Sequence, residues 1–583
     1  MTNDPSPTER KQPFLNRDLT QLMLAILIGV LSGYGAILFK YLLKSMQWLF
    51  YQHSGEFLEY AHEIPMWAKV SMPALGGLIV GLVVHFFASE AKGHGVPEVM
   101  QAIALRGGVI RKRVAAAKIF ASAVTIGSGG SVGREGPMVQ IGSSIGSSIG
   151  QVFKVPSRHM RTMIGCGAAA GIAATFNAPI AGVLFALEII IGDWGMTSFS
   201  PVVLSSVTAT AISRYYFGNF PAFEIPHYAV VSPWEYLMYP FLGVASGLIA
   251  LSFTRILYAF EDGFEGLRFM PEWIKPAVGG AMLGVLVIFC PESFGVGFGA
   301  MNLSLTNQMG FVMLFALIWV KILASSLTLG SGGSGGIFAP SLFIGAMTGG
   351  AFGSLMNIMF PGVTASPGAY ALVGMGGLVA GTTYAPITAI LIIFEMTGSY
   401  SIILPLMLTC ITALVLNSSI SKASIYTIKL LRKGIDLTGG RVQNVLKKML
   451  VVEMMSEDVV TVSEGATLEA IVWTFKTENA SYLHVVDGDG MLKGIISFRD
   501  IRPVLHEEGL LQLLIAKDIC TTDLATIHME DTLQTALDLI TEKGVSQLPV
   551  VDADGRLIGS LTESAINSAY GQELVRQELS GEG

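Results

Sequence analysis

The chain has 583 residues, of which 51% are hydrophobic and only 14% are charged, whereas soluble domains average about 25% charged residues. This composition excludes an ordinary soluble protein, and a net charge of −7 without a concentrated basic face argues against nucleic-acid binding. The four cysteines have no paired spacing, so neither a disulfide framework nor a thiolate metal site is expected.

The first 20 residues are polar, and apolar windows long enough to span a membrane recur from Leu22 to Ile420. No small-residue cleavage site follows the first window, so we expect it to remain in the mature protein. The basic run at 106–113 lies between apolar segments, where such charges mark the cytoplasmic side. The pattern predicts a multi-pass protein of a prokaryotic inner membrane, with a cytoplasmic N-terminal segment (1–20) and both termini in the cytoplasm.

An internal repeat organises the apolar region. Residues 118–146 align with residues 321–349 at a constant offset of 203, with 15 identities in 29 positions. Two further pairs follow in the same order: FNAPIAGVLFALE (176–188) with YAPITAILIIFE (384–395), and more weakly GHGVP (93–97) with GVGFG (295–299). The membrane region therefore consists of two related halves, at about 70–220 and 275–425. Duplicated halves with glycine- and proline-interrupted apolar segments point to a central binding site.

Three glycine-rich breaks each precede a helical apolar pattern: GHGVPEV (93–99), GREGP (133–137) and GGIFAP (335–340). A helix that starts inside a bilayer leaves its first N–H groups unpaired and carries partial positive charge at that end. The ligand that suits such a start is an anion. None of the three breaks has the Lys-Ser/Thr of a phosphate-binding loop, so a nucleotide site in the membrane is not expected.

These motifs, the FNAP stretch and a tyrosine after the last apolar segment resemble the CLC family of chloride channels and proton-coupled chloride exchangers. The resemblance covers about residues 21–440. It implies an all-α polytopic membrane domain built from two inverted repeats with broken helices, in a homodimer with one anion pore per subunit. The implied substrate is chloride or a similar small anion, with protons as a second substrate in the exchangers.

The resemblance assigns the gate to Glu135, the glutamate of GREGP. A carboxylate at a helix start can occupy the position of an anion, and protonation would release it, so flux should respond to pH and to anion concentration. The alternative is that Glu135 only caps the helix or pairs with Arg134. Arg134 is expected to be a structural anchor. Lys118, which recurs at Lys321, is expected to set the local electrostatics or to satisfy helix C-terminal carbonyls.

The chloride-binding groups of the family map onto the backbone N–H groups of Ile337 and Phe338, the hydroxyl of Tyr426, and the His94-Gly95 pair of GHGVP. His94 stands where chloride-selective members have serine. An imidazole can donate to an anion as a hydroxyl does, but it is larger and titrates nearer neutral pH. The alternative is that His94 is a packing residue.

A second departure from the family concerns protons. Proton-coupled members carry a glutamate directly after the one that matches Glu188, and this chain has Ile189 there. Isoleucine cannot carry a proton, which favours a gated channel, although an exchanger with another internal proton route stays open. Glu188 and Glu395 occupy equivalent places in the two halves, which favours a structural or interface role for both.

Other function classes fit less well. An enzyme would need a polar catalytic cluster, and the nine histidines form no metal-binding spacing of the His-Glu-x-x-His type. A divalent-cation transporter would need several carboxylates along its pathway, and a nucleotide-sensing membrane protein would not need so long an apolar region.

The segment 441–583 has ordinary soluble polarity and contains a second duplication, in which residues 484–501 align with residues 549–566 with eight identities in eighteen positions. Each copy combines two short strand patterns around an Asp-Gly turn with a preceding helical segment, Thr467–Thr477 or Thr532–Lys543. The segment resembles a linker followed by a tandem pair of α/β CBS domains, at about 450–515 and 516–575.

CBS pairs commonly bind adenine nucleotides such as ATP between the two copies. The ribose-binding pattern Ser/Thr-x-x-Asp is present at Ser497 and Asp500 but is broken in the second copy, where Thr562 is followed by Ala565. The resemblance therefore implies at most one usual nucleotide site. The alternative is that the pair only dimerises or stabilises the protein.

Overall fold

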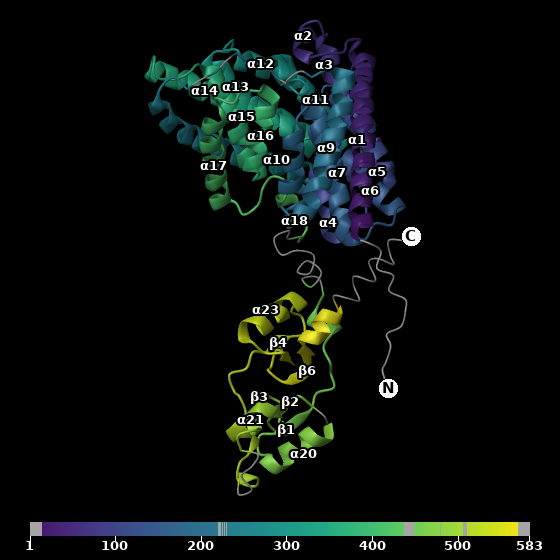
Figure 1. The fold of residues 1–583 in the computed structure, drawn as a ribbon, viewed down its shortest axis with the longest axis vertical. Coiled ribbons are helices and arrows are strands. Elements are labelled where there is room, and N and C mark those ends of the chain that lie inside the picture. The colour runs from purple at the N-terminus through teal and green to yellow at the C-terminus, as the bar shows by residue number, and fades with distance from the viewer. Residues whose placement is uncertain are drawn as a thin grey trace. The chain divides into compact units, whose positions relative to one another are not determined.

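The computed structural model describes residues 14–569 except for residues 220–222, 224, 227, 229, 436–445, 447, 448, 479 and 505–509. The chain divides into two compact units, Met1–Gly434 and Ile435–Gly583, whose elements are drawn in Figure 1. Of the predicted N-terminal segment, residues 1–13 lie outside the described residues, and the first helix begins at Phe14.

The regular elements of the first unit are helices, and they occur twice in one order (Figure 1). The helices α1 (Phe14–Tyr51) and α2 (Phe57–Tyr60) precede the first half. The first half comprises α3 (Met66–Phe86), η1 (Ser89–Ala91), α4 (Val96–Leu105), α5 (Lys112–Gly127), α6 (Glu135–Val152), α7 (Ser157–Phe176), α8 (Pro179–Phe185), η2 (Ala186–Ile191) and α9 (Met196–Phe217).

The helices η3 (Pro233–Leu237) and α10 (Met238–Gly266) lead into the second half. The second half comprises α11 (Lys275–Phe289), η4 (Pro291–Ser293), α12 (Phe298–Leu305), α13 (Phe311–Gly330), α14 (Phe338–Met359), α15 (Pro367–Thr383), α16 (Pro386–Thr397) and α17 (Ile403–Ile420), and α18 (Ile428–Arg432) follows it. The predicted repeat therefore extends through the whole helical order, from α3 and α11 to α9 and α17.

The halves meet through reciprocal contacts. Helix α3 packs on α11, and α8 packs on α16. A Cβ added at Gly77 would overlap the carbonyl of Pro276, and one added at Gly280 would overlap the carbonyl of Pro73, so each helix needs a glycine where the other's proline crosses it. Contacts that recur with the roles of the halves exchanged indicate an approximate two-fold relation, as expected for inverted repeats.

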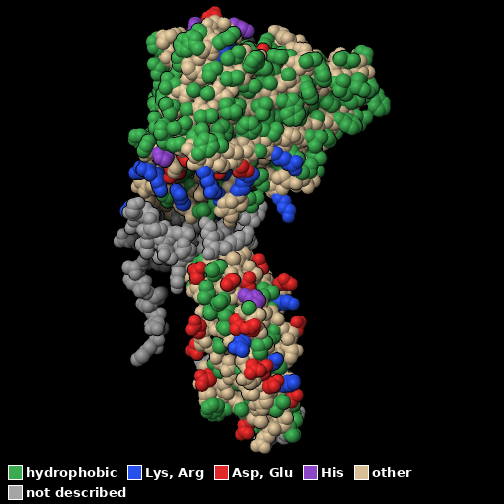
Figure 2. Space-filling view, turned by 180° about the vertical axis from the view of Figure 1, so that it is seen from behind, with side chains coloured by type: hydrophobic (Ala, Val, Ile, Leu, Met, Phe, Trp, Pro, Cys, Tyr) green, Lys and Arg blue, Asp and Glu red, His purple; other side chains and the backbone are tan. Residues whose placement is uncertain are grey.

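The first unit has the surface of a membrane protein. Among the described residues, six helices are long and apolar enough to cross a bilayer: Leu19–Tyr51, Met66–Phe86, Pro233–Gly266, Phe311–Gly330, Phe338–Met359 and Ile403–Ile420. Figure 2 shows this unit covered by apolar side chains, with Lys and Arg gathered along its lower edge in that view. Shorter apolar helices such as Pro386–Thr397 do not reach across a bilayer by themselves, so the predicted broken helices are present.

The second unit contains two copies of one small α/β motif. In each described copy a three-stranded sheet pairs its first two strands in parallel and its last two antiparallel. The first copy has β1 (Thr461–Ser463), α20 (Leu468–Glu478), β2 (Tyr482–Val486), β3 (Leu492–Ser497) and α21 (Phe498–Ile501). The second has α22 (Ala516–Ile519), β4 (Ile527–His528), α23 (Leu533–Lys543), β5 (Gln547–Val551) and β6 (Leu557–Thr562).

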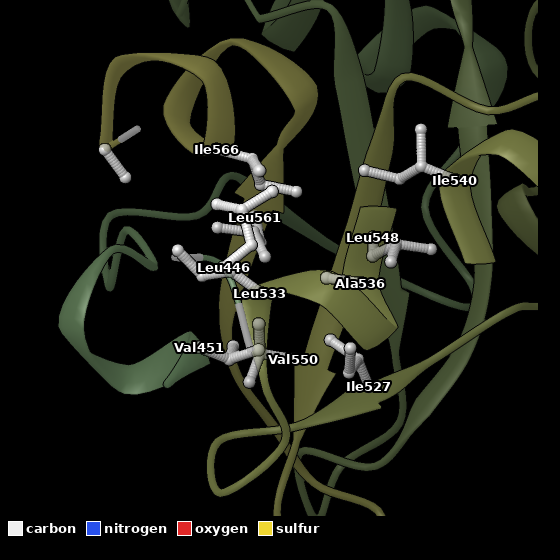
Figure 3. Packing of buried hydrophobic residues seen from close by; sticks show 11 residues of the cluster. Leu446, Val451, Ile527, Leu533, Ala536, Ile540, Leu548, Val550, Leu561 and Ile566 are labelled. Carbon is white, nitrogen blue, oxygen red and sulfur yellow. The ribbon is translucent and has the colours of Figure 1, made fainter. Parts of the chain in front are cut away.

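The core of the second copy lies between its helices and its sheet (Figure 3). Leu533 and Ala536 of α23 pack against Leu548 and Val550 of β5, all of them buried. The alternating apolar pattern of the strand and the helical spacing of α23 thus place their apolar faces on the same core. The helices predicted at 467–477 and 532–543 are confirmed to within one residue, as α20 and α23.

Candidate functional site

The glycine-rich segments before three helices meet at the centre of the first unit. Gly133 and Gly336, which precede α6 and α14, exchange backbone hydrogen bonds of 2.7 and 2.6 Å in an antiparallel bridge. Gly93, which precedes α4, pairs with Ser334 in a parallel bridge. The starts of α4, α6 and α14 are therefore brought together by backbone pairing between segments that lie far apart in the sequence.

Two serines brace these segments across the halves. The amide of Ser131 donates to Thr328 Oγ1 at 3.2 Å, and its hydroxyl donates to the carbonyl of Ser293 at 3.0 Å. The equivalent Ser334 mirrors both bonds, since its amide donates to Thr125 Oγ1 at 3.3 Å and its hydroxyl donates to the carbonyl of Ala91 at 2.8 Å. Each half thus holds the glycine-rich segment of the other.

Glu135 is the first residue of α6 and is 1% exposed. Neither of its carboxylate oxygens has a hydrogen-bond partner among the described residues. A Cβ added at Gly133 would overlap Glu135 Oε2, so the carboxylate lies back over the glycine that precedes it. A buried carboxylate without a partner is costly, and such groups inside membranes are usually functional.

Three of the predicted anion-binding residues, Gly95, Ile337 and Phe338, lie at the starts of α4 and α14. Ile337 is the N-cap residue of α14 and Phe338 is its first residue, and their amides donate to no acceptor among the described residues. Gly95 has φ +88° where α4 begins, a conformation that favours glycine, and a Cβ added at Gly136, next to Glu135, would overlap the carbonyl of His94. The start of α6 therefore packs directly against the segment that leads into α4.

The side chain of His94 is buried beside the ring of Tyr258. It is 2% exposed, its Nδ1 has no partner in the described part of the chain, and its ring meets that of Tyr258 edge-on with 6.3 Å between centroids. Tyr426, in the segment between α17 and α18, is also buried. The unpaired ring nitrogen leaves His94 able to donate to a ligand.

The sequence of residues 76–418 matches the family described as voltage gated chloride channel, and residues 451–507 and 516–571 each match the CBS domain. The chain belongs to the CLC family, with a C-terminal pair of CBS domains. It is accordingly a multi-pass membrane protein that transports chloride, and it is not an enzyme.

Individual relatives match most of this chain and nearly the whole of their own length. A putative chloride channel protein ClcB-like from Ralstonia nicotianae is 37% identical over 71% of this chain and 97% of its own length. An H+/Cl− exchange transporter ClcA from Vibrio parahaemolyticus is 32% identical over 72% of this chain and 92% of its own. The crystal structure of a eukaryotic CLC transporter superposes with a TM-score of 0.63 at 21% identity, covering 94% of this chain and 98% of that one. The last likeness concerns the fold alone and extends over nearly the whole chain, the CBS region included.

In this CLC protein the two equivalent lysines, Lys118 and Lys321, are buried and hold the segments that precede α4 and α12. Lys118 Nζ donates to the carbonyls of Ala91 and Gly93 at 3.0 and 2.7 Å. Lys321 Nζ donates to the carbonyls of Ser293 and Gly295 at 3.3 and 2.9 Å. The carbonyls belong to the 3-10 turns η1 and η4 and the loops behind them, so each lysine fixes the approach to a helix start.

A cavity of about 490 Å3 is lined by Arg134, which directly precedes Glu135. Its lining includes three cations, Lys40, Lys44 and Arg134, against a single carboxylate, Glu56. The guanidinium of Arg134 lies 5.2 Å from the ring centroid of Phe298, and its Nε has no hydrogen-bond partner among the described residues. Arg134 therefore faces a cationic cavity and forms no ion pair with Glu135 in the structure.

Sequence analysis missed a cluster of three charged residues, Glu98, Glu261 and Lys429, of which Glu98 lies four residues after His94. Lys429 Nζ lies 2.9 Å from Glu98 Oε1 and 3.9 Å from Glu261 Oε1, with all three side chains largely buried. Glu98 Oε2 has no further hydrogen-bond partner among the described residues. Glu98 stands one residue after the GHGVP motif and Lys429 three residues after Tyr426, so their positions beside two predicted site residues were the available signal.

The structure also shows the surroundings of Ile189, which stands where proton-coupled members of the family carry a glutamate. Ile189 lies in the π-helical turn η2 and is buried, directly after Glu188. The carboxylate of Glu188 accepts hydrogen bonds from the amides of Ile387 and Thr388 at 3.3 and 2.8 Å, at the start of α16. Glu188 is therefore engaged as a helix cap.

The predicted nucleotide-binding residues line one cavity of about 1400 Å3 between the CBS copies. Ser497 and Asp500 bond to each other, with Ser497 Oγ 2.7 Å from Asp500 Oδ2, and cap α21. Thr562 lines the same cavity, and its Oγ1 accepts a hydrogen bond from Ala565 at 3.1 Å. The lining also carries Arg499 and Glu563. The cavity is wide and open enough to admit a nucleotide-sized ligand.

Proposed function

We propose that this CLC protein passes chloride or a similar small anion along a pathway that the Glu135 carboxylate closes. One observation carries the proposal: this carboxylate is buried and, among the described residues, neither its oxygens nor the amides of Ile337 and Phe338 at the start of α14 have a hydrogen-bond partner. A carboxylate in that position takes the place of an anion, and protonation would remove its negative charge. His94, Gly95 and Tyr426 complete the proposed anion-binding set.

Arg134 and Lys118 support this pathway without binding the permeating ion at the gate. Lys118 fixes the segment that carries His94 and Gly95. Arg134, with Lys40 and Lys44, gives the adjacent cavity a net positive lining. Clefts lined by one sign of charge concentrate counter-ions, so this cavity serves as the entrance through which anions reach the gate.

Transport is by a gated channel mechanism in this proposal. Buried Ile189 cannot carry a proton, and its neighbour Glu188 is held as a helix cap by two backbone amides. The second candidate is a proton-coupled exchanger. It is favoured by the retained Glu135 and by the cluster of Glu98, Glu261 and Lys429, which offers an internal ionisable group near His94.

Reconstitution into liposomes with an outward chloride gradient tests both candidates. The channel predicts chloride efflux that collapses the gradient without moving protons uphill. Uphill proton movement driven by chloride would instead establish the exchanger, and absence of any chloride flux in wild-type liposomes would contradict the pathway itself.

The protein is further proposed to be a homodimer in a prokaryotic inner membrane, with both termini cytoplasmic. Ile180 of α8 and Ile387 of α16 lie where these helices pack, and both side chains are largely exposed. They offer an apolar surface for a second copy. The basic loop at 106–113 assigns its own side of the membrane to the cytoplasm. Mass measurement of the protein in detergent would distinguish dimer from monomer.

The CBS pair is proposed to bind an adenine nucleotide such as ATP and to regulate transport. Support comes from the cavity that Ser497, Asp500 and Thr562 share, in which the exposed Arg499 supplies a cation for phosphates. ATP titration followed by calorimetry on the full chain tests this proposal. Asp500→Asn should weaken binding, whereas Asp554→Asn, in an exposed turn outside the cavity, should not. Equal affinities in the two variants would remove Asp500 from the site.

A further inference from the structure

An apolar groove lies between the end of α3 and the beginning of α5. It encloses about 480 Å3 and is lined by Val83, Phe86 and Phe87 on one side and by Arg113, Ala116, Ala117 and Phe120 on the other. The four α5 residues are spaced i, i+3, i+4 and i+7, so they form one face of that helix. The groove takes no part in the anion pathway proposed above.

Small and large side chains alternate to give this groove its shape. Ala116 and Ala117 form a low floor on α5, and Phe120 closes one end. Phe86 and Phe87 rise beside it with exposed fractions of 69% and 68%. Beneath it lies a packed cluster that includes Val80, Val84 and Ala121. The floor is therefore fixed by the core, and the trough is open to the surroundings along its length.

One end of the groove is cationic. Arg113 lines it, and Lys112 precedes it at the first position of α5. Both side chains are exposed, and neither has a carboxylate within ion-pair distance among the described residues. Their neighbours Arg106 and Arg111 share a single carboxylate, Glu90, at 4.0 and 3.6 Å. The loop thus keeps an excess of positive charge beside an apolar trough.

We propose that this groove binds an anionic phospholipid. The acyl chain lies on Ala116 and Ala117 between the phenylalanine rings, and the phosphate lies against Arg113 and Lys112. The excess of positive charge at Lys112 and Arg113 favours an anionic headgroup, since each basic residue near the membrane surface adds to the attraction of anionic lipids. The apolar lining is what a lipid chain requires. Figure 2 shows Lys and Arg gathered along one edge of the apolar unit. The assignment of the groove to the cytoplasmic leaflet rests on the topology in the proposed function.

Lipid binding to the full chain, purified in a neutral detergent, can be measured by native mass spectrometry with added phosphatidylglycerol or phosphatidylcholine. The wild-type protein should retain phosphatidylglycerol more tightly than phosphatidylcholine. Arg113→Gln should lower phosphatidylglycerol affinity about fivefold, which is the effect of one basic residue near anionic lipid, and leave phosphatidylcholine unchanged. Ala116→Leu fills the trough without removing a charge and should weaken both lipids.

Lys154→Gln is the matched control, because this exposed lysine lies two residues beyond the C-terminal end of α6 and does not line the groove. It should bind both lipids as the wild type does. Equal affinity of the wild type for the two lipids would overturn the proposal, as would unchanged binding in both Arg113→Gln and Ala116→Leu. An equal loss in Lys154→Gln and Arg113→Gln would show diffuse attraction and would also overturn it. These readouts do not depend on anion flux, so they stand apart from the transport assay.

Discussion

Glu188 and Glu395 cap each other's helices across the two halves of the membrane unit. Glu395 accepts hydrogen bonds from the amides of Ile180 and Ala181 at 3.1 and 2.6 Å, where α8 begins. Glu188 accepts the equivalent bonds from Ile387 and Thr388 at the start of α16, and a further one from the hydroxyl of Thr388 at 2.7 Å. The unpaired N–H groups of one broken helix are thus satisfied by the carboxylate at the end of the other.

Removing either cap should destabilise the membrane unit. Glu188→Gln and Glu395→Gln each replace charged acceptors by a single neutral one, and hydrogen bonds to charged groups contribute about 1.5–3 kcal/mol. We expect a lower thermal unfolding temperature in detergent for both variants. Glu59→Gln alters an exposed carboxylate in α2 and serves as the control. Unchanged unfolding of both cap variants would show that these bonds contribute no stability.

Glu135→Gln should give anion flux that no longer depends on pH. The amide keeps the size of the side chain but cannot carry the negative charge that competes with an anion at the helix start. Chloride efflux from liposomes at several pH values measures this. A variant with the wild-type pH profile would remove Glu135 from the gate.

Gly133→Ala should open the same gate while the carboxylate is kept. The added methyl group would overlap Glu135 Oε2, so the carboxylate must leave its present position. Chloride flux at neutral pH should rise towards that of Glu135→Gln. Gly263→Ala, in α10, adds a methyl group where no atom lies within 4 Å and should leave flux unchanged. Normal flux and normal pH dependence in Gly133→Ala would contradict the proposed role of the Glu135 carboxylate as the gate.

His94→Ser should change anion selectivity. The imidazole is buried, and its Nδ1 has no hydrogen-bond partner among the described residues, whereas a serine hydroxyl is smaller and does not titrate. Relative permeabilities of chloride, nitrate and fluoride in liposomes would report the change. If the ratios stay the same, His94 lies outside the selectivity site.

The CBS unit should lose stability in acid through His484. This β2 residue is buried, with Nδ1 3.3 Å from the carbonyl of Val460, and its burial holds the pKa of the imidazole below its ordinary value. The unfolded chain then binds a proton that the folded chain does not, so stability falls as pH drops below about 6.5.

Hydrogen exchange of β2 amides in the full chain, corrected for intrinsic rates, would show this loss between neutral and acidic pH. His484→Leu should flatten the dependence. His528→Gln alters an exposed histidine of the second copy and should retain it. A steep dependence that survives in His484→Leu would assign the effect to other groups.

Sequence reasoning located the helix starts at residues 96, 135 and 338 almost correctly, because glycine and proline act locally on the backbone. It could not anticipate Lys40 and Lys44 in the entrance cavity, since their position depends on how α1 packs beside α6 and α7. The Lys429–Glu98 pair joins residues 331 positions apart, and no local pattern encodes such a pairing. The repeat was visible in the sequence, but the exchange of caps between Glu188 and Glu395 required the fold.

The serine braces have a consequence for the origin of this architecture. The amides of Ser131 and Ser334 find their acceptors only on the opposite half, at Thr328 and Thr125. A single half on its own would leave these buried groups, and the N–H groups capped by Glu188 or Glu395, without partners. An ancestor with one copy of the repeat could complete the site only by pairing with a second molecule. Duplication and fusion of its gene would then have turned that intermolecular contact into a permanent one, and freed each copy to acquire its own residues at positions 135 and 338.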